Sequence, residues 1–336
     1  MFKRVLPALF LCIFAAPAWS QSEPVTANAV DSAPEKILIV GQRPGPGLWR
    51  VSKDDHVLWI FGTYSPFPKK MVWRSQQVET VMAQSQEFLG VPSAGVSVGF
   101  SNSLNFITAL PFIVGYKKTP DGSHLQALVP ADVYARWTAL KTKYIGDDSG
   151  IETDRPIFAA QELYQKALEK SGLGSDRDVV ASIKQIAQKN KIKFTSTGIS
   201  VAVENPRGAL RDFKKSSLDD LECFAKTIDR LEIDLGAMRT RANAWAIGDV
   251  EMMRKLTYPD QAEACNSAVI NSSWTKALPG AQSLEQRLRD TWLGAAEKAL
   301  ASNQSTFALL PVSQIMSPTG LLAALQAKGY VVEQPE

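Results

Sequence analysis

The pattern of hydrophobic and polar residues predicts strands near the start of the chain. Leu48–Val51 and His56–Tyr64 are apolar runs on either side of a short polar turn, which is the pattern of a β-hairpin. A helix is expected over Arg74–Leu89, where apolar residues recur at helical spacing. Further short strands are expected near Phe88–Val91 and, ahead of the hairpin, at Ile37–Val40.

The end of the chain mirrors its start. Thr306–Val312 is an apolar run typical of a buried strand, and Gly329–Glu333 predicts a closing strand. Helical patterns over Leu284–Ala301 and Gly320–Lys328 precede these two strands.

The middle of the chain is mostly helical. Asp154 is the expected N-cap of a helix that carries Pro156 in its first turn. Asp178 is expected to cap a helix over Asp178–Lys189, and Ile192–Thr197 predicts a strand after it.

A long helix is predicted further along the helical region. Ser217 and Asp220 have the spacing of a capping box. After them, apolar residues from Leu221 to Met238 mark one face of a single helix. Gly248-Asp249 ends one helix and begins another.

These patterns predict the α/β class. The sheet is expected to be built from N- and C-terminal strand segments, with a large helical insertion over about 104–280. Residues 37–336 are expected to form a single domain, since strands at both ends of the chain predict one sheet and no internal repeat is visible.

The first twenty residues have the pattern of a signal peptide. A positive start with Lys3 and Arg4 leads into an apolar run, and Ala18 and Ser20 are small residues at the expected cleavage positions. Residues 21–36 form a polar tether that is expected to be disordered. The mature protein is therefore expected to be periplasmic or secreted, with no membrane span after cleavage of the signal peptide.

Composition narrows the classes of partner and cofactor. Lys plus Arg (37) nearly balance Asp plus Glu (34), so nucleic acid is not expected to bind. Only two histidines occur, His56 and His124, which excludes a site with three histidine ligands. No metal and no cofactor are expected.

Two cysteines remain once Cys12 leaves with the signal peptide. Cys223 and Cys265 are expected to form a disulfide in an oxidising compartment. The alternative is one reactive thiol, but Cys223 lies in a helical apolar pattern where a nucleophile would be poorly exposed.

One short pattern could belong to a serine hydrolase. Gly95–Gly99 matches G-x-S-x-G, in which a strained turn exposes the hydroxyl of Ser97. The partner would be His124 with Asp121 or a later acid. Such hydrolases place the acid before the histidine and normally far from it, whereas Asp121 is only three residues away.

The order of the patterns resembles the TraB/GumN family, which is related to the Tiki metalloproteases. The segments that carry the resemblance cover most of the mature chain and are Gly47–Lys53, His56–Thr63, Pro156–Leu163, Ala244–Val250 and Gly320–Val332. The resemblance implies a divalent-metal site at which two Gly-x-x-His motifs meet.

Neither motif keeps its histidine in this chain. The first reads Gly62-Thr63-Tyr64-Ser65, with serine in the last position, and the second reads Pro311-Val312-Ser313-Gln314, with glutamine there. The acid that the family carries after the next strand is missing from Phe88–Pro92. The Arg-Asn signature of the late helix is blurred in Leu288–Trp292, where Asp290 follows Arg289.

The resemblance therefore implies a scaffold that has lost its metal centre. A hydroxyl or an amide is a poor replacement for imidazole as a ligand of divalent metals, so the balance is against an enzyme. If a cleft remains, it is expected near Gly62, Thr63, Ser65, Ser313 and Gln314, for a small ligand or a protein partner. The alternatives are a hydrolase or peptidase with relocated metal ligands, and the Ser97 hydrolase.

Overall fold

The computed structural model describes residues 45–69, 71–98, 114–255, 261–281 and 283–335. The expected signal peptide, the tether and the strand at Ile37–Val40 lie outside the described residues. In the described part of the chain, no helix combines the length and the apolar character needed to cross a bilayer.

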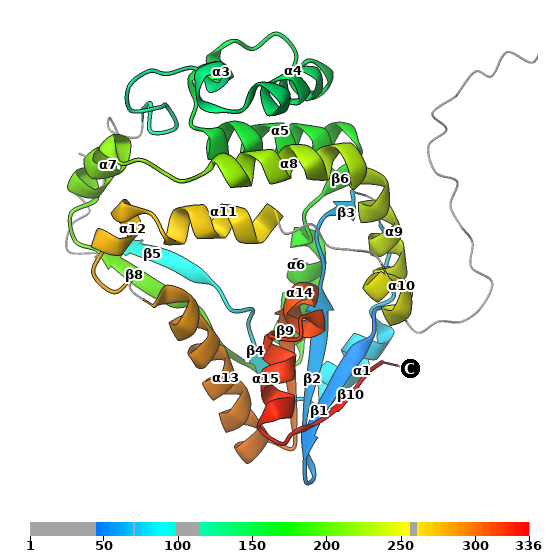
Figure 1. The fold of residues 1–336 in the computed structure, drawn as a ribbon. Coiled ribbons are helices and arrows are strands. Elements are labelled where there is room, and N and C mark those ends of the chain that lie inside the picture. The colour runs from blue at the N-terminus through cyan, green and yellow to red at the C-terminus, as the bar shows by residue number, and fades with distance from the viewer. Residues whose placement is uncertain (1–44, 70, 99–113, 256–260, 282, 336) are drawn as a thin grey trace, which may run out of the picture. The chain divides into compact units, whose positions relative to one another are not determined.

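A six-stranded mixed sheet joins the two ends of the chain (Figure 1). Its strands, in spatial order, are β10 (Val331–Glu333), β1 (Leu48–Lys53), β2 (His56–Thr63), β9 (Ser305–Pro311), β4 (Glu87–Leu89) and β7 (Lys193–Thr195). The predicted α/β class and the hairpin are confirmed. β7 also enters this sheet, although it falls within the insertion expected over about 104–280.

Parallel and antiparallel pairs divide the sheet into two parts. The hairpin β1–β2 is antiparallel, from Leu48 opposite Phe61 to Lys53 opposite His56, and β10 pairs antiparallel with the outer side of β1. β2, β9, β4 and β7 run parallel to one another. The carboxyl ends of four strands therefore meet at one edge.

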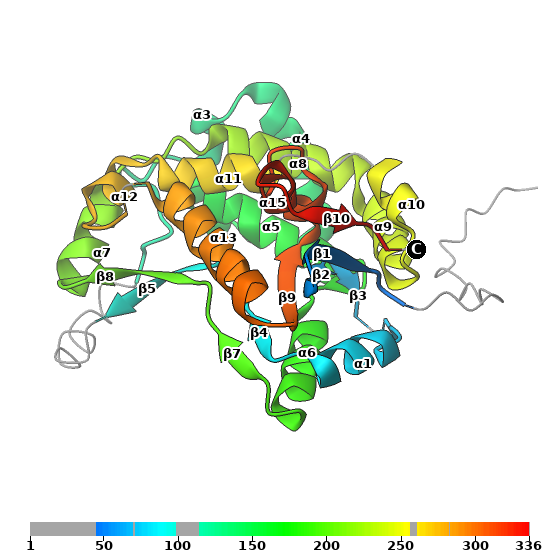
Figure 2. The ribbon, with the colours of Figure 1, turned by 90° about the horizontal axis from the view of Figure 1, so that it is seen from below.

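Helices cover both faces of the sheet, which explains why its central strands are apolar runs (Figure 2). One face carries α13 (Leu284–Ser302) and α15 (Leu321–Ala327), and the other carries α1 (Gln76–Gln84) and α6 (Arg177–Lys189). The core between these layers includes Leu58, Ile60, Phe61, Phe307 and Leu309, all at most 1% exposed.

A second hydrophobic core holds the helical region together. It forms around Trp137, Leu163 and Phe224, with the Trp137 and Phe224 rings 5.2 Å apart. The helices that contribute to it are α3 (Leu125–Leu128), α4 (Ala131–Tyr144), the 3-10 turn η2 (Gly150–Thr153), α5 (Pro156–Lys170) and α8 (Leu221–Ile233).

The remaining elements connect the sheet to these helices. The helices are α7 (Pro206–Lys215), α9 (Leu235–Ala246), α10 (Val250–Lys255), α11 (Gln261–Ile270), α12 (Ser273–Ala277) and α14 (Val312–Met316). Two short ribbons pair β3 (Phe67–Pro68) with β6 (Leu173–Gly174) and β5 (Ala94–Val98) with β8 (Ile199–Val203).

The helix starts differ from those predicted. α5 has Arg155 as its N-cap residue, and Asp154 instead forms an ion pair with Lys118 at 2.7 Å. A residue outside α5 accepts a hydrogen bond from its N-terminal turn: the Ile157 backbone N–H donates to the Asp220 carboxylate at 2.9 Å. α6 likewise has Asp176, not Asp178, as its N-cap.

The predicted long helix is two helices. The helical pattern breaks at Asp234, so α8 ends at Ile233 and α9 begins at Leu235. Asp234 is 4% exposed, and both of its oxygens accept from Arg241, which is 1% exposed. Ser217 precedes α8 without capping it, since Asp220 is the N-cap residue.

The residues just before β1 and just after β10 meet beside the sheet. Gly47, just before β1, packs so closely against Pro335 that a Cβ at this position would overlap the proline ring.

At the amino ends of the parallel strands, Glu87 accepts from Lys193 at 3.0 Å and from Asn303 at 2.8 Å. Burial would raise the pKa of Glu87, but the hydrogen bonds from Thr195, Lys193 and Asn303 outweigh it and lower the pKa.

The predicted disulfide is present. Cys223 in α8 and Cys265 in α11 are bonded, closing a loop with a sequence separation of 42. Cys223 is 1% exposed and packs with Ile157 and Ala268. The bond therefore holds α11, which follows an undescribed stretch of chain, against the helical core.

We expect the Cys223→Ala/Cys265→Ala variant to lose roughly 4 kcal/mol of unfolding free energy, because a loop of this length gains entropy in the unfolded chain once it is open. Urea unfolding with and without reductant measures the loss. Reductant should lower the unfolding free energy of the oxidised wild type and leave that of the double variant unchanged. Equal stability of the oxidised wild type and the variant would contradict the expectation.

Candidate functional site

The pairing of β2 with β9 brings the two motif segments to the same edge of the sheet. Gly62 lies opposite Leu310, and Thr63 lies opposite Pro311, so both strands end together. In α/β proteins ligands bind outside the carboxyl ends of parallel strands. This edge is therefore the part of the sheet at which the motif positions could act jointly.

The side chains at this edge differ in exposure. Thr63 is buried at the end of β2, whereas Ser65, two residues later, is exposed. Just after the neighbouring strand β9, Ser313 is exposed and Gln314 is half-buried, both in the first turn of α14. The edge thus presents hydroxyl and amide groups to solvent.

Close packing fixes the backbone at Gly62. A Cβ there would lie 2.9 Å from Val312 Cγ2 and 3.0 Å from Trp49 Cζ3, so only glycine fits without movement of its neighbours. The Trp245 indole N–H donates to the Gly62 carbonyl at 2.6 Å, and Trp245 is buried. The Ala244–Val250 segment therefore supports the end of β2.

The chain after β2 is held by the start of α9. The Tyr64 hydroxyl donates to the Met238 carbonyl at 3.4 Å. One turn earlier, Asp234 binds Arg241, and Arg230 Nε lies 3.5 Å from the same carboxylate. Burial raises the pKa of Asp234, although Arg241 and Arg230 act in the opposite direction.

An arginine from α13 fixes the chain that follows α14. Arg289 donates to the Thr319 carbonyl at 2.8 Å and to the Gly320 carbonyl at 3.4 Å. Gly320 in turn packs against the Gln314 backbone, where a Cβ would overlap the carbonyl. Arg289 lies in the segment compared with the late-helix signature of the family. Its two hydrogen bonds to backbone carbonyls give it a structural role beside the edge.

The carboxyl end of β4 offers no charged ligand. Gly90 donates its N–H to the Thr195 carbonyl at 3.0 Å, and Thr197 Oγ1 donates to the Gly90 carbonyl at 2.8 Å. Val91 and Pro92 follow. Among the described residues, no three His, Cys, Asp or Glu side chains are grouped so that they could hold a metal ion.

The structure places Ser97 in a strand. It lies inside β5, opposite Ala202 of β8, and not on the strand-to-helix turn that a nucleophile elbow requires. His124 is the N-cap residue of α3, and the Asp121 carboxylate accepts from the Ser123 backbone N–H at 3.0 Å. Residues 95–98 therefore do not form the elbow that the alternative of a Ser97 hydrolase would need, and Gly99 lies outside the described residues.

Two pockets formed by described residues lie away from the strand ends. One of about 350 Å³ lies between α7 and α12. The sequence did not predict this pocket, because the two helices that form it are far apart in the chain. The other, of about 210 Å³, lies at the β1–β2 turn beside His56, whose Nδ1 is 2.6 Å from the Leu300 carbonyl oxygen. Neither is lined by Gly62, Thr63, Ser65, Ser313 or Gln314.

We expect Gly62→Ala to lose about 1–3 kcal/mol of unfolding free energy, because the added methyl group overpacks the contact with Val312 and Trp49. Gly294→Ala in α13 is the matched control, since nothing lies within 4 Å of its added Cβ. The control should gain up to about 1 kcal/mol from helix propensity. Thermal unfolding of both variants measures the difference, and equal shifts would contradict the packing argument.

Comparison with known proteins places the chain in a family. The model of the TraB/PrgY/gumN family matches residues 47–334, from just before β1 to just after β10. No curated protein and no solved structure matches the chain. The match includes both ends of the sheet and the helices between them. The chain belongs to the TraB/PrgY/gumN family.

Proposed function

We propose that this protein is an exported member of the TraB/PrgY/gumN family that has lost its metal centre and uses the strand-end edge to bind a small ligand or a protein partner. The pairing of Thr63 with Pro311 carries the proposal, because it brings the segments of Ser65 and Gln314 to one edge of the sheet. By the family resemblance described above, these two residues stand where the family has histidines.

The donor chemistry at this edge supports binding without metal-assisted hydrolysis. A neutral hydroxyl and a neutral amide bind divalent first-row metals poorly. Metal-assisted hydrolysis needs an ion that lowers the pKa of a bound water, and the described residues at the strand ends provide neither imidazole nor carboxylate for that purpose. Hydroxyl and amide groups remain suited to hydrogen bonds with an uncharged polar ligand.

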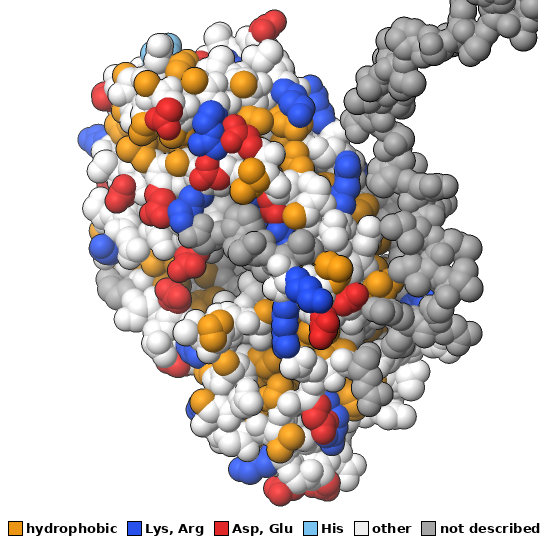
Figure 3. All heavy atoms as spheres, turned by 45° about the vertical axis from the view of Figure 1, so that its right-hand side comes forward, with side chains coloured by type: hydrophobic (Ala, Val, Ile, Leu, Met, Phe, Trp, Pro, Cys, Tyr) orange, Lys and Arg blue, Asp and Glu red, His pale blue; other side chains and the backbone are white. Residues whose placement is uncertain are grey.

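Charge gives no reason to favour nucleic acid as the partner. The chain carries a formal net charge of +3. On the face that Figure 3 shows, Lys and Arg side chains are interspersed with Asp and Glu side chains among the described residues. A small ligand or a protein partner is therefore favoured.

We expect the purified mature protein to hold far less than one ion per chain after exposure to manganese, cobalt and zinc followed by dialysis. Elemental analysis measures the content. One tightly held ion per chain would contradict the proposal and favour a hydrolase with relocated ligands.

A pair of variants tests the edge geometry in the same experiment. Ser65→His/Gln314→His restores imidazoles at the strand ends and should raise the metal content above that of the wild type. Ser65→His/Gln326→His is the matched control, because Gln326 lies near the C-terminal end of α15, away from the strand ends. Four residues later, the Tyr330 ring faces Lys53 at the opposite end of the hairpin. Equal metal binding by both pairs would contradict the shared site.

Export has its own test. When the full chain is expressed in a Gram-negative host, we expect the protein in the periplasmic fraction with Gln21 as its N-terminal residue, because Ser20 ends the predicted signal peptide. N-terminal sequencing after fractionation measures this. An uncleaved protein in the cytoplasm would contradict the proposed export.

A further inference from the structure

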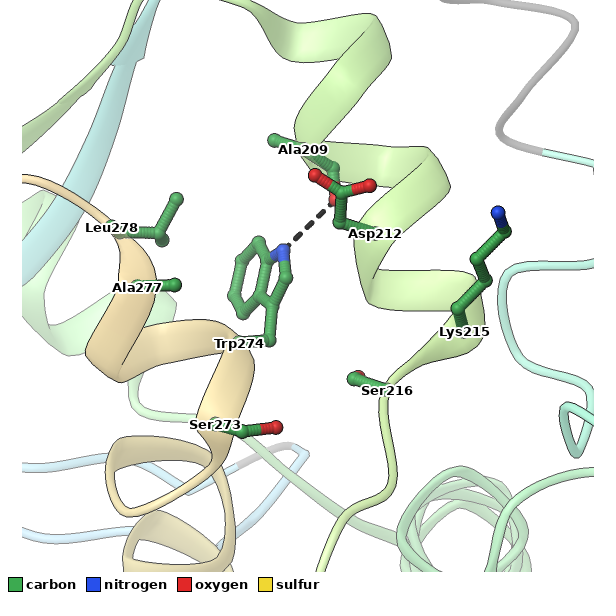
Figure 4. Close-up of a pocket in the computed structure, with 8 residues that line it drawn as sticks. All are labelled: Ala209, Asp212, Lys215, Ser216, Ser273, Trp274, Ala277 and Leu278. Carbon is green, nitrogen blue, oxygen red and sulfur yellow. Dashed lines mark hydrogen bonds between the residues drawn. The ribbon is translucent and has the colours of Figure 1, made fainter.

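The pocket between α7 and α12 has the chemistry of a site for a neutral ligand (Figure 4). Its volume of about 350 Å³ lies at the lower end of the range of about 300–1,000 Å³ found for small-molecule sites. The residues of its lining that carry the argument are Asp212, Lys215, Ser216, Ser273, Trp274 and Leu278. None of them belongs to the strand-end edge.

The indole of Trp274 is held in one orientation. Its N–H donates to the Ala209 carbonyl at 2.9 Å, which joins α12 to α7 (Figure 4). The Phe213 ring packs against the indole edge to face, with centroids 5.1 Å apart. Since the N–H is already satisfied, the indole offers a ligand its apolar surface.

Phe213, which contacts the Trp274 indole, belongs to a series of packed aromatic rings. Phe213 contacts Phe158 at 6.2 Å, and Phe158 contacts Tyr116 at 5.3 Å. The buried Arg155 guanidinium lies 4.7 Å from the Phe213 centroid and donates to the Phe213 and Lys214 carbonyls at the end of α7. The pocket is thus built on packed side chains and needs little rearrangement to bind.

Both helices that frame the pocket have capped N-termini. The Asn205 side chain accepts from the Gly208 N–H at 2.9 Å at the start of α7. The Ser272 hydroxyl accepts from the Thr275 N–H at 3.1 Å at the start of α12. These caps fix the short helices that position the polar groups of the pocket.

The polar groups surround the indole. In Figure 4, Asp212 lies on one side of the ring, the side chains of Ser216 and Ser273 point toward each other on the other side, and Lys215 points away. This arrangement combines an apolar ring surface with a carboxylate and two hydroxyls at its rim. A ligand that fits must itself have an apolar face and hydroxyl groups around it.

Charge favours a neutral ligand. Helix α7 has a net positive charge, which disfavours a cation, because it carries Arg207, Arg211, Lys214 and Lys215 against the single acid Asp212. An anion would meet the Asp212 carboxylate beside the indole. Arg211 Nε lies 3.7 Å from that carboxylate, but both groups are exposed and such a pair is weak.

We propose that this pocket binds a hexopyranose residue of a free sugar or glycan. The C–H face of the sugar ring packs on the Trp274 indole, Asp212 accepts hydrogen bonds from ring hydroxyls, and Ser216 and Ser273 bond the hydroxyls on the opposite side. The site is independent of the strand-end edge and of the function proposed for that edge.

Ligand-observed NMR on the full mature protein tests the proposal. The probes are glucose, galactose, N-acetylglucosamine and cellobiose. We expect at least one of them to bind with a Kd of about 10 mM or below, with saturation transferred most strongly to the C–H protons of one ring face. The absence of transfer to all four sugars at about five times that concentration would overturn the proposal.

Two variants locate the binding. Trp274→Ala removes the stacking surface and should weaken binding at least about tenfold, which corresponds to about 1.4 kcal/mol. Ala277→Phe fills the pocket from an exposed position of α12 and should abolish binding with the fold intact by circular dichroism. Sugar binding that survives both substitutions would overturn the proposed site.

Three controls establish whether sugar binding belongs to this pocket. Trp59→Phe changes a half-buried tryptophan of β2 and should leave sugar binding unchanged. Ser65→His/Gln314→His should also leave it unchanged, which separates this site from the strand-end edge. Binding of inorganic phosphate or tetramethylammonium that is lost in Ala277→Phe, with no sugar binding in the wild type, would assign the pocket to a charged ligand and overturn the proposal.

Discussion

The parallel pairing of β2 with β9 is the interaction on which the rest of the structure depends. It joins residues 56–63 to residues 305–311, and the chain between them supplies β4, β7 and the helical region. Apolar side chains from both strands are buried between two helical layers, so this pair is also the centre of the main core. The edge with the motif positions exists only because these two strands end together.

The backbone at this edge is held by side chains from other segments of the chain. Trp245 donates to the Gly62 carbonyl, and Arg289 donates to two carbonyls after α14. These contacts involve backbone atoms, and they do not depend on which side chains occupy positions 65 and 314. Backbone support therefore keeps the strand ends in place independently of the metal chemistry implied by the family resemblance.

The sequence predicted elements where a local pattern determines them. The hairpin, β9 and β10 follow from apolar runs with clear boundaries, and the Cys223–Cys265 bond follows from the count of cysteines. The cap of α5 could not be predicted, because the acid that accepts its N–H is Asp220, 63 residues away. The pocket between α7 and α12 was missed for the same reason, since Trp274 bonds to Ala209 across 65 residues.

The contact between Gly47 and Pro335 has a mechanical consequence. β1 starts and β10 finishes at the same end of their antiparallel pair, with Arg50 opposite Glu333. Tension applied through residues 47 and 335 would therefore open the hydrogen bonds of this pair one after another, as a zipper opens, and would not load them all in shear. An unfolding machine that pulls on both ends would meet its first resistance at β10, and the buried seam between β2 and β9 would be loaded only after that strand had peeled away.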